Sequence, residues 1–318
     1  MSTQNYGEKI DSQVVALDYA IRDYEFKQNK PGCIECGYNA ENRYGTETTY
    51  WNYLSNAAFD KFKASMSDEH RDQYKKAQGG ELEEKKGKYG DTCPPKMASF
   101  GSSSRFVYNI SREIDGFYFE RKLPTKVGSY PANLDGYLKH NGTDIFVEAK
   151  CREIYKSYEK QKVSKSYKKI YTELEMLYPG FSFEDCGQKD KNRFYCTFKF
   201  NGEPILHFDV KQLISHFLGI TAGILEGKVT TNVKFVYLIF NPYKDGVSFD
   251  NEKIKSYEED IKSVYDKAIK EVTDFDMKDL FKYVMKIQQK RLAKLPSKND
   301  SFNFEIADQN DYLEILKK

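Results

Sequence analysis

The feature that most constrains this chain is a tight turn at residues 141–142, Asn-Gly, set within the segment LDGYLKHNGTDIFVEAKC. Asn-Gly is typical of the type I′ turn of a two-residue β-hairpin, because both central residues need a positive φ angle. Such a turn fixes which residues of the two strands face each other. The register predicts Leu138 opposite Ile145, and Asp135 opposite Glu148.

Side chains alternate between the two faces of a strand, so this hairpin has one apolar face and one ionisable face. The apolar face is suited to packing under helices and carries Leu134, Leu138, Ile145, Val147, Ala149 and Cys151. The other face carries Asp135, Tyr137, Phe146, Glu148 and Lys150. The chemistry of the chain is therefore expected on this second face.

Directly opposed carboxylates have Cβ atoms only about 4.5–5.5 Å apart and repel each other unless a cation lies between them. Mg²⁺ prefers oxygen ligands and binds through one or two carboxylates, with water and phosphate completing its octahedron. Lys150, two residues after Glu148, is within reach of a metal-bound water or a phosphate. Two acids and a lysine around one cation can cleave phosphodiesters. The alternative is a solvated edge hairpin with a surface ion pair.

These residues resemble the PD-(D/E)XK nuclease superfamily, which has the restriction-endonuclease-like fold. Asp135 matches the first acid of its motif, and Glu148-Ala149-Lys150 matches the (D/E)-X-K element on the next strand. The first motif departs from the family name, because Pro131 lies four residues before Asp135. The stretch from PANLDGYL through FVEAKCRE is most similar to bacterial members described as restriction or defence nucleases.

The resemblance implies that Asp135, Glu148 and the Ala149 carbonyl hold Mg²⁺, with Mn²⁺ as a substitute. It implies that Lys150 orients or deprotonates the attacking water, and that in-line attack leaves a 5′-phosphate. Gln212 lies on a predicted helix where members often place a glutamine or another polar residue. We therefore include Gln212 in the site; a satisfied polar residue under the hairpin is the alternative. His216, one turn further along, has the same alternatives.

In many members a glutamate of the first core helix completes the site. Glu113 is our choice for this further metal ligand, because Arg105, Asn109 and Glu113 recur every four residues along one helical face. Glu120, on the strand that follows, is the alternative. An ordinary surface or ion-pair role is open for both glutamates.

The predicted fold class is α/β: a restriction-endonuclease-like mixed β-sheet core flanked by helices, with helical N- and C-terminal additions. Residues 1–100 are interpreted as an accessory segment, mainly helical and loop. The nuclease core spans residues 101–250 and carries an insertion at about 152–207, and residues 251–318 form a helical segment. The pattern of apolar residues predicts helices at 14–21, 48–62, 105–114, 152–193, 210–225, 254–272 and 280–293, strands at 117–123 and 233–240, and a second hairpin at 194–208 that turns at 201–202.

Basic residues are dense immediately after the hairpin: eight fall from Lys150 to Lys169, with tyrosines interleaved. This density predicts contact with DNA phosphates, whereas a solvated helix face diluted by acids is the alternative. The DNA-binding candidates are Lys156, Lys160, Lys165 and Lys168.

Cys33 and Cys36 have the spacing of a zinc knuckle, but a structural zinc needs four ligands and only Cys93 and His70 lie nearby in sequence. We favour free thiols.

The predicted function is a Mg²⁺-dependent DNA endonuclease in restriction or phage defence. A DNA repair or structure-specific nuclease, and a catalytically weak nucleic-acid-binding module on the same fold, are the alternatives. DNA is the expected partner, and a homodimer follows only from the need to cut both strands. The net charge of +2 does not itself indicate nucleic acid. Since no stretch approaches the roughly 18 to 20 apolar residues of a membrane span, we expect a soluble, cytoplasmic protein.

Overall fold

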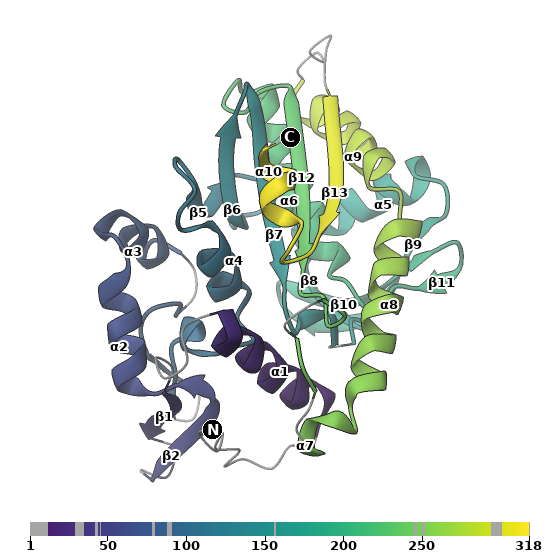
Figure 1. Cartoon of the computed structure of the whole chain (residues 1–318). Coiled ribbons are helices and arrows are strands. Elements are labelled where there is room, and N and C mark those ends of the chain that lie inside the picture. The colour runs from purple at the N-terminus through teal and green to yellow at the C-terminus, as the bar shows by residue number, and fades with distance from the viewer. Residues whose placement is uncertain are drawn as a thin grey trace.

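The structure, a computed structural model, is built around a five-stranded mixed sheet (Figure 1). The sheet contains, in spatial order, β13 (Ser301–Ala307), β12 (Asn232–Ile239), β7 (Thr143–Lys150), β6 (Ala132–His140) and β5 (Tyr118–Leu123). The structure describes residues 12–28, 35–41, 44, 46–77, 80–87, 91–155, 157–244, 247–249, 252–293 and 301–317. The predicted mixed sheet with flanking helices is confirmed.

Strand direction divides the sheet into two parts. β5, β6 and β7 form an antiparallel meander, whereas β12 runs parallel to β7 and β13 runs parallel to β12. Parallel neighbours require long crossover connections, and helices supply them here. The first crossover contains α6 (Val210–Leu225), and the second contains α8 (Glu258–Asp274) and α9 (Met277–Leu292).

The hairpin forms at the predicted turn and in the predicted register. Asn141 and Gly142 both have positive φ, and the ladder pairs Leu138 with Ile145. The ladder stops at Gly136 and Val147, however, so the expected pairing one step further, between Asp135 and Glu148, is absent from it. The regular pairing of β6 with β7 therefore ends one step before Asp135 and Glu148 would face each other.

β6 also changes face along its length. Leu134 belongs to the hydrophobic cluster under α6, whereas Leu138 belongs to the cluster on the opposite side of the sheet. In a regular strand these two side chains would share a face. The prediction that Leu134 shares the apolar face of Leu138 was wrong, because the two side chains pack in clusters on opposite sides of the sheet.

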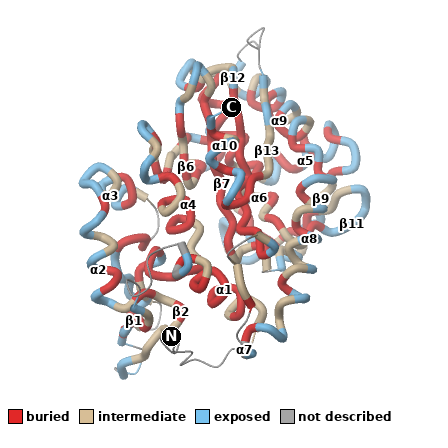
Figure 2. The backbone as a smooth tube through the Cα atoms, in the orientation of Figure 1, coloured by how far each residue is buried: buried red, intermediate tan, exposed pale blue. Residues whose placement is uncertain are grey.

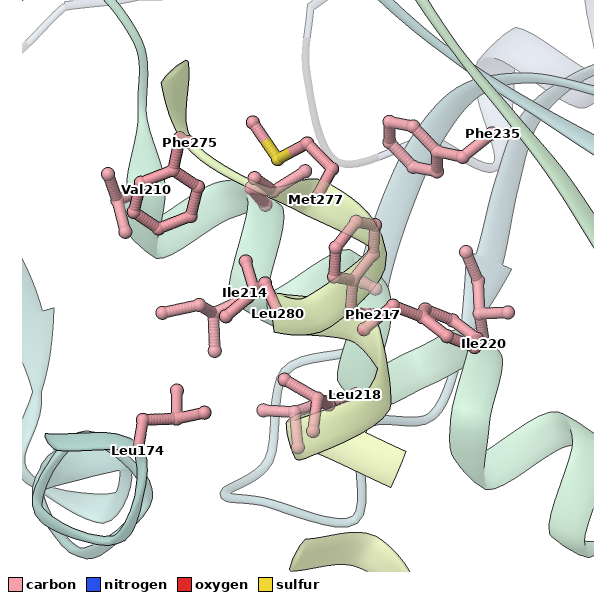
Figure 3. Close-up of a cluster of buried hydrophobic side chains, with 14 of the residues drawn as sticks. Leu174, Val210, Ile214, Phe217, Leu218, Ile220, Phe235, Phe275, Met277 and Leu280 are labelled. Carbon is pink, nitrogen blue, oxygen red and sulfur yellow. The ribbon is translucent and has the colours of Figure 1, made fainter. Parts of the chain in front are cut away.

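Two hydrophobic clusters sandwich the sheet. In β12, Phe235 and Tyr237 pack toward α6 and α9, whereas Val236 and Leu238 pack toward the other side, as period-two alternation requires. Figure 3 shows the first cluster, in which apolar side chains of α6 interlock with those of α9 and with Phe235. Both faces are buried, which explains the nearly continuous apolar sequence of β12.

The second cluster covers the other face and joins the N-terminal region to the sheet. It contains buried residues of α1 (Gln13–Gln28), α4 (Ser103–Ser111) and α10 (Tyr312–Lys317). Figure 2 shows the tubes of α1, α4 and the central strands mostly in the buried colour, with exposed backbone gathered at the periphery. Residues before 100 therefore share a core with the sheet.

The N-terminal region contains strands where helix and loop were expected. The predicted helix at 48–62 is instead β2 (Glu47–Leu54), paired with β1 (Cys36–Glu41), followed by α2 (Asn56–Ser65). Threonine and aromatic residues favour the strand, and Ser55 begins the helix by accepting a hydrogen bond from the Ala58 amide. The region is completed by α3 (Asp68–Lys75), β3 (Lys85–Lys86), β4 (Thr92–Cys93) and the 3₁₀ turn η1 (Lys96–Ala98).

The insertion after the hairpin is mostly a second sheet, so the predicted helix at 152–193 was wrong over much of its length. The insertion contains η2 (Glu153–Tyr155), β8 (Gln161–Ser164), η3 (Lys165–Tyr167), α5 (Lys168–Leu177), β9 (Phe181–Asp190), β10 (Arg193–Phe200) and β11 (Glu203–Pro204). β10 buries Phe194, Cys196 and Phe198 at period two. The predicted turn at 201–202 is present and joins β10 to β11.

The C-terminal part is helical to Leu292, and a strand and a short helix follow among the described residues. α7 (Glu252–Lys255), α8 and α9 agree with the predicted helices, but β13 and α10 were not predicted. β13 is an edge strand that is partly exposed, so polar residues alternate with apolar residues along it.

Candidate active site

Three carboxylates occupy the same level on three neighbouring strands. The register of β5 with β6 brings Glu120 level with Asp135, and the register of β6 with β7 brings Asp135 level with Glu148. Neither pair belongs to the backbone ladder, although the ladder reaches their immediate neighbours. The three acids thus form a row across a local interruption of the sheet.

Glu120 has the most unusual backbone of the three. Its φ is 56°, a left-handed conformation that is uncommon for a residue with a side chain and is often found at functional sites. The carboxylate is buried, and it accepts hydrogen bonds from Ser104 Oγ at 3.1 Å and from the Asn133 side-chain amide. These contacts hold the Glu120 carboxylate beside β6.

The Asp135 side chain accepts a hydrogen bond from β7 at a point where the backbone ladder of β6 and β7 has ended. Its Oδ2 accepts a hydrogen bond from the Ala149 amide at 2.8 Å. Because the Phe240 amide donates to the Lys150 carbonyl, Lys150 directs its backbone groups toward β12, and the alternating residue Ala149 directs its own toward β6. The Ala149 carbonyl is therefore on the same side of β7 as the Asp135 carboxylate.

Glu148 is the centre of a buried network with α6. Lys150 Nζ donates to Glu148 Oε1 at 2.5 Å and to Gln212 Oε1 at 2.8 Å. His216 Nε2 lies 2.9 Å from Glu148 Oε2, although the direction of this contact departs from hydrogen-bond geometry, which leaves Oε2 buried without a hydrogen-bond donor in the described structure. Gln212 and His216 are thus both brought to the hairpin, where the family resemblance led us to expect a polar residue.

Burial and charge shift the pKa values of the row in opposite directions. Burial first, then repulsion by Glu148 and Glu120, raises the pKa of Asp135 well above its ordinary value. Burial raises the pKa of Glu120 to about 7. Burial also acts to raise the pKa of Glu148, but the charges of Lys150 and His216 outweigh it and lower this pKa to about 2. The pKa of Lys150 is raised well above its usual value by Glu148, against the effect of burial.

All three acids line one cavity of about 910 Å³, together with Lys150 and Gln212. The opposite wall comes from the N-terminal region and includes Tyr50, Tyr53, Glu81, Cys93, Pro94, Lys96 and Ser99. These wall residues were missed from the sequence, because no local pattern reveals which distant segment covers a sheet edge.

The structure places Glu113 away from this cavity. α4 ends at Ser111, so Glu113 lies beyond the helix, where its side chain is 89% exposed and pairs with Arg112 at 3.4 Å. The helical face expected to point Glu113 at the metal instead directs Arg105 and Asn109 to Glu25. Glu120, the alternative, is the glutamate that lines the cavity.

The basic candidates do not converge on the acids. Lys160 and Lys165 are exposed, and Lys168 donates to Asp185 at 2.7 Å. Lys156 lies outside the described residues, as does Cys33 of the possible zinc knuckle. Within the described residues, Cys36 and Cys93 form no disulfide.

The donors around the row suit a hard divalent cation. Asp135, Glu148 and the Ala149 carbonyl offer oxygen atoms only, the set that Mg²⁺ prefers, and Glu148 Oε2 has no hydrogen-bond donor. Within the described ranges, no three His, Cys, Asp or Glu side chains are already gathered as a metal-holding group. A cation at the row would therefore have to displace Lys150 or His216 from Glu148, or draw the carboxylates together.

No family model, curated protein or solved structure matches this chain. None of the helices in the described ranges has the length and apolar character needed to span a membrane.

Proposed function

We propose that the protein is a Mg²⁺-dependent DNA endonuclease that hydrolyses phosphodiester bonds, acts in the cytoplasm, and serves restriction or phage defence. The observation that carries this proposal is the row of Glu120, Asp135 and Glu148 across three strands, with Lys150 beside it in one cavity. Like charges at this spacing are unfavourable in a metal-free protein, and a divalent cation compensates them.

The metal ligands in this proposal are Asp135, Glu148 and the Ala149 carbonyl, with Glu120 in the position that Glu113 was expected to take. With Mg²⁺ or Mn²⁺ held by these residues, the site would gain a Lewis acid, which would polarise a phosphate and lower the pKa of a bound water.

Lys150 acts in this proposal as a donor rather than as a base. In the metal-free protein the Glu148 carboxylate raises the pKa of Lys150, which favours the protonated ammonium that can orient a water or contact a phosphate oxygen. Gln212 holds the ammonium in place through its Oε1, and His216 keeps Glu148 charged. The sequence prediction left both roles of Lys150 open, and this proposal takes orientation of the water.

The order of elements also supports the proposal of a restriction-endonuclease-like fold. α4, β5, the β6–β7 hairpin, α6 and β12 follow one another as helix, strand, hairpin, helix and strand. DNA contact by Lys160 and Lys165, and a homodimer that cuts both strands, are parts of the same proposal.

Two features favour the alternative functions, a structure-specific nuclease and a nucleic-acid-binding module. Glu148 and Lys150 are only 2% and 6% exposed, which favours a nuclease that acts on DNA ends or branched structures over one that acts on intact duplex. The closed Glu148–Lys150–His216 network is also what a nucleic-acid-binding module with structural acids would contain.

The test is incubation of plasmid and of single-stranded DNA with the protein in Mg²⁺, Ca²⁺ or EDTA, beside Asp135→Asn, Lys150→Ala and Glu120→Gln. We expect cleavage in Mg²⁺ alone, lost in Asp135→Asn and Lys150→Ala and reduced in Glu120→Gln. Glu113→Gln is the matched control and should cleave normally, because its side chain is outside the cavity. DNA binding without cleavage by any folded form would favour the binding module.

A further inference from the structure

The charge of the cavity is unfavourable for a phosphate. Among its described lining residues, six are acidic (Glu81, Glu120, Asp135, Glu148, Glu153 and Asp209) and three are basic (Lys96, Lys150 and Arg152). Lys96 pairs with Glu81 at 2.9 Å and Lys150 pairs with Glu148, so two of the three cations are neutralised by acids of the cavity itself. Arg152 is the exception.

The partner of Arg152 lies behind the cavity wall. Arg152 Nη1 donates to Asp18 Oδ2 at 2.8 Å, and Asp18, on α1, is fully buried and does not line the cavity. The same oxygen accepts a hydrogen bond from the Asn52 side-chain amide at 2.6 Å. One N–H of the guanidinium is thus bound to Asp18, which is not part of the cavity lining. The arginine side chain is 26% exposed, and its other N–H groups have no hydrogen bond within the described structure.

The packing around this pair is tight. A Cβ added at Gly101 would overlap Asp18 Oδ1 and come within 2.8 Å of Arg152 Cδ, so the absence of a side chain at residue 101 lets the two residues meet. Burial raises the pKa of Asp18 to about 6, against the lowering effect of Arg152, so Asp18 depends on the guanidinium for its charge. Three segments that are distant in sequence therefore fix the position of one arginine.

We propose that Arg152 binds a backbone phosphate of the nucleic acid and that Asp18 is its positioning residue. A guanidinium presents donors that match phosphate oxygens, and anchoring one of them removes much of the side-chain freedom that binding would otherwise cost. The inference rests on the proposed function for the identity of the ligand, and it gives the N-terminal region a role in binding the substrate.

The experiment measures binding of a short fluorescein-labelled single-stranded oligonucleotide by anisotropy, in Ca²⁺ and over a range of salt concentrations. Arg152→Ala should weaken binding about tenfold and reduce the slope of log K against log salt by about 0.7, the value for one lost phosphate contact on a single strand. Arg152→Lys should weaken binding less while keeping the slope. Arg112→Ala, which removes an exposed arginine outside this cavity, should change neither.

Asp18→Asn separates positioning from a general effect on the fold. It should weaken binding in the wild-type background but have no further effect on Arg152→Ala, because Asp18 acts only through the guanidinium. Equal weakening in both backgrounds would overturn the positioning role. An unchanged affinity and salt slope in Arg152→Ala would overturn the phosphate contact, as would a wild-type protein that does not bind the oligonucleotide.

The outcome of the binding experiment does not depend on whether the protein cleaves DNA. If the wild-type protein binds and the arginine variants behave as expected, but Mg²⁺ produces no cutting, the proposed nuclease activity fails while the role of Arg152 stands. If Mg²⁺ produces cutting and the arginine variants bind as the wild type does, the reverse holds.

Discussion

The three acids of the row differ in how readily each carboxyl group loses its proton. Glu148 stays ionised because Lys150 and His216 face it, whereas Asp135 and Glu120 have raised pKa values because they are buried beside other carboxylates. In the metal-free protein the ionisation of Asp135 and Glu120 near neutral pH is therefore unfavourable, and this has consequences for stability.

The first prediction concerns Glu120 and pH. Its folded-state pKa of about 7 lies above its ordinary value of 4.5, so the folded state binds more protons and its stability falls as pH rises from about 4.5 to 7. Glu120→Gln should remove this part of the pH dependence and raise the free energy of unfolding at pH 7 by on the order of 1–3 kcal/mol. Urea unfolding of both proteins between pH 4.5 and 8 without metal measures it; parallel curves would contradict the prediction.

The second prediction concerns Asp135. Because burial and its neighbours disfavour its ionised form, the isosteric change Asp135→Asn should raise the melting temperature of the metal-free protein by a few degrees, corresponding to about 1 kcal/mol. The same change should abolish any stabilisation by Mg²⁺. Calorimetry with and without Mg²⁺ checks both effects, and a variant that is still stabilised by Mg²⁺ would remove Asp135 from the proposed ligands.

The residues of the site were predictable where they follow from local register. Asp135, Glu148 and Lys150 follow from a turn whose geometry the sequence specifies, whereas Gln212 was expected only from the family resemblance. Glu113 was not correctly placed, because the spacing of Arg105, Asn109 and Glu113 also fits a face that binds Glu25. The contact between Asp18 and Arg152 was not predicted, because it depends on tertiary packing that brings α1 beside the segment after β7.

Among the helices, α6 contributes both to the stability of the fold and to the position of a site residue. Its N-cap residue Asp209 accepts a hydrogen bond from the Gln212 amide at 2.8 Å, so the cap fixes the first turn that presents Gln212 to Lys150. Helix α9 has an equivalent cap, Asp276, which accepts from the Asp279 amide at 3.0 Å far from the acids.

The third prediction compares these two caps. Asp209→Ala and Asp276→Ala should each lower the free energy of unfolding by about 1 kcal/mol. Only Asp209→Ala should also lower kcat/KM for the proposed cleavage, by about tenfold or more, because Gln212 moves. Unfolding curves and cleavage rates of the pair provide the measurement; equal activities would show that α6 does not position the site.

Elements were predictable where their signals are local. The helix at 210–225 and the strand at 233–240 agree with α6 and β12 within a residue or two, because a cap and a buried apolar run define them. β9, β10 and β13 form by pairing with strands elsewhere, and their lysine-rich or half-exposed sequences carry weaker periodicity.

At the scale of the whole molecule, the N-terminal region is part of both the core and the cavity. Buried residues such as Tyr19, Phe59, Tyr74 and Phe100 belong to the cluster that covers one face of the sheet. Each large apolar side chain stabilises by roughly 1.5–3 kcal/mol when fully buried, and total stabilities are only about 5–15 kcal/mol.

The fourth prediction follows: a variant that starts at residue 102 should lack a cooperative unfolding transition. Circular dichroism during urea titration tests it, with the intact chain as reference. A truncated chain that unfolds cooperatively, with a stability near that of the intact protein, would mean that the sheet and residues before 102 are independent units.

The most direct test of the central claim is calorimetric titration of Mg²⁺ into the metal-free protein at pH 7, in two buffers of different ionisation enthalpy. We predict saturable binding with release of protons, because carboxylates with raised pKa values must ionise to hold the cation, and loss of that binding in Asp135→Asn. Absence of binding, or equal binding by wild type and Asp135→Asn, would contradict a metal centre at the row of acids.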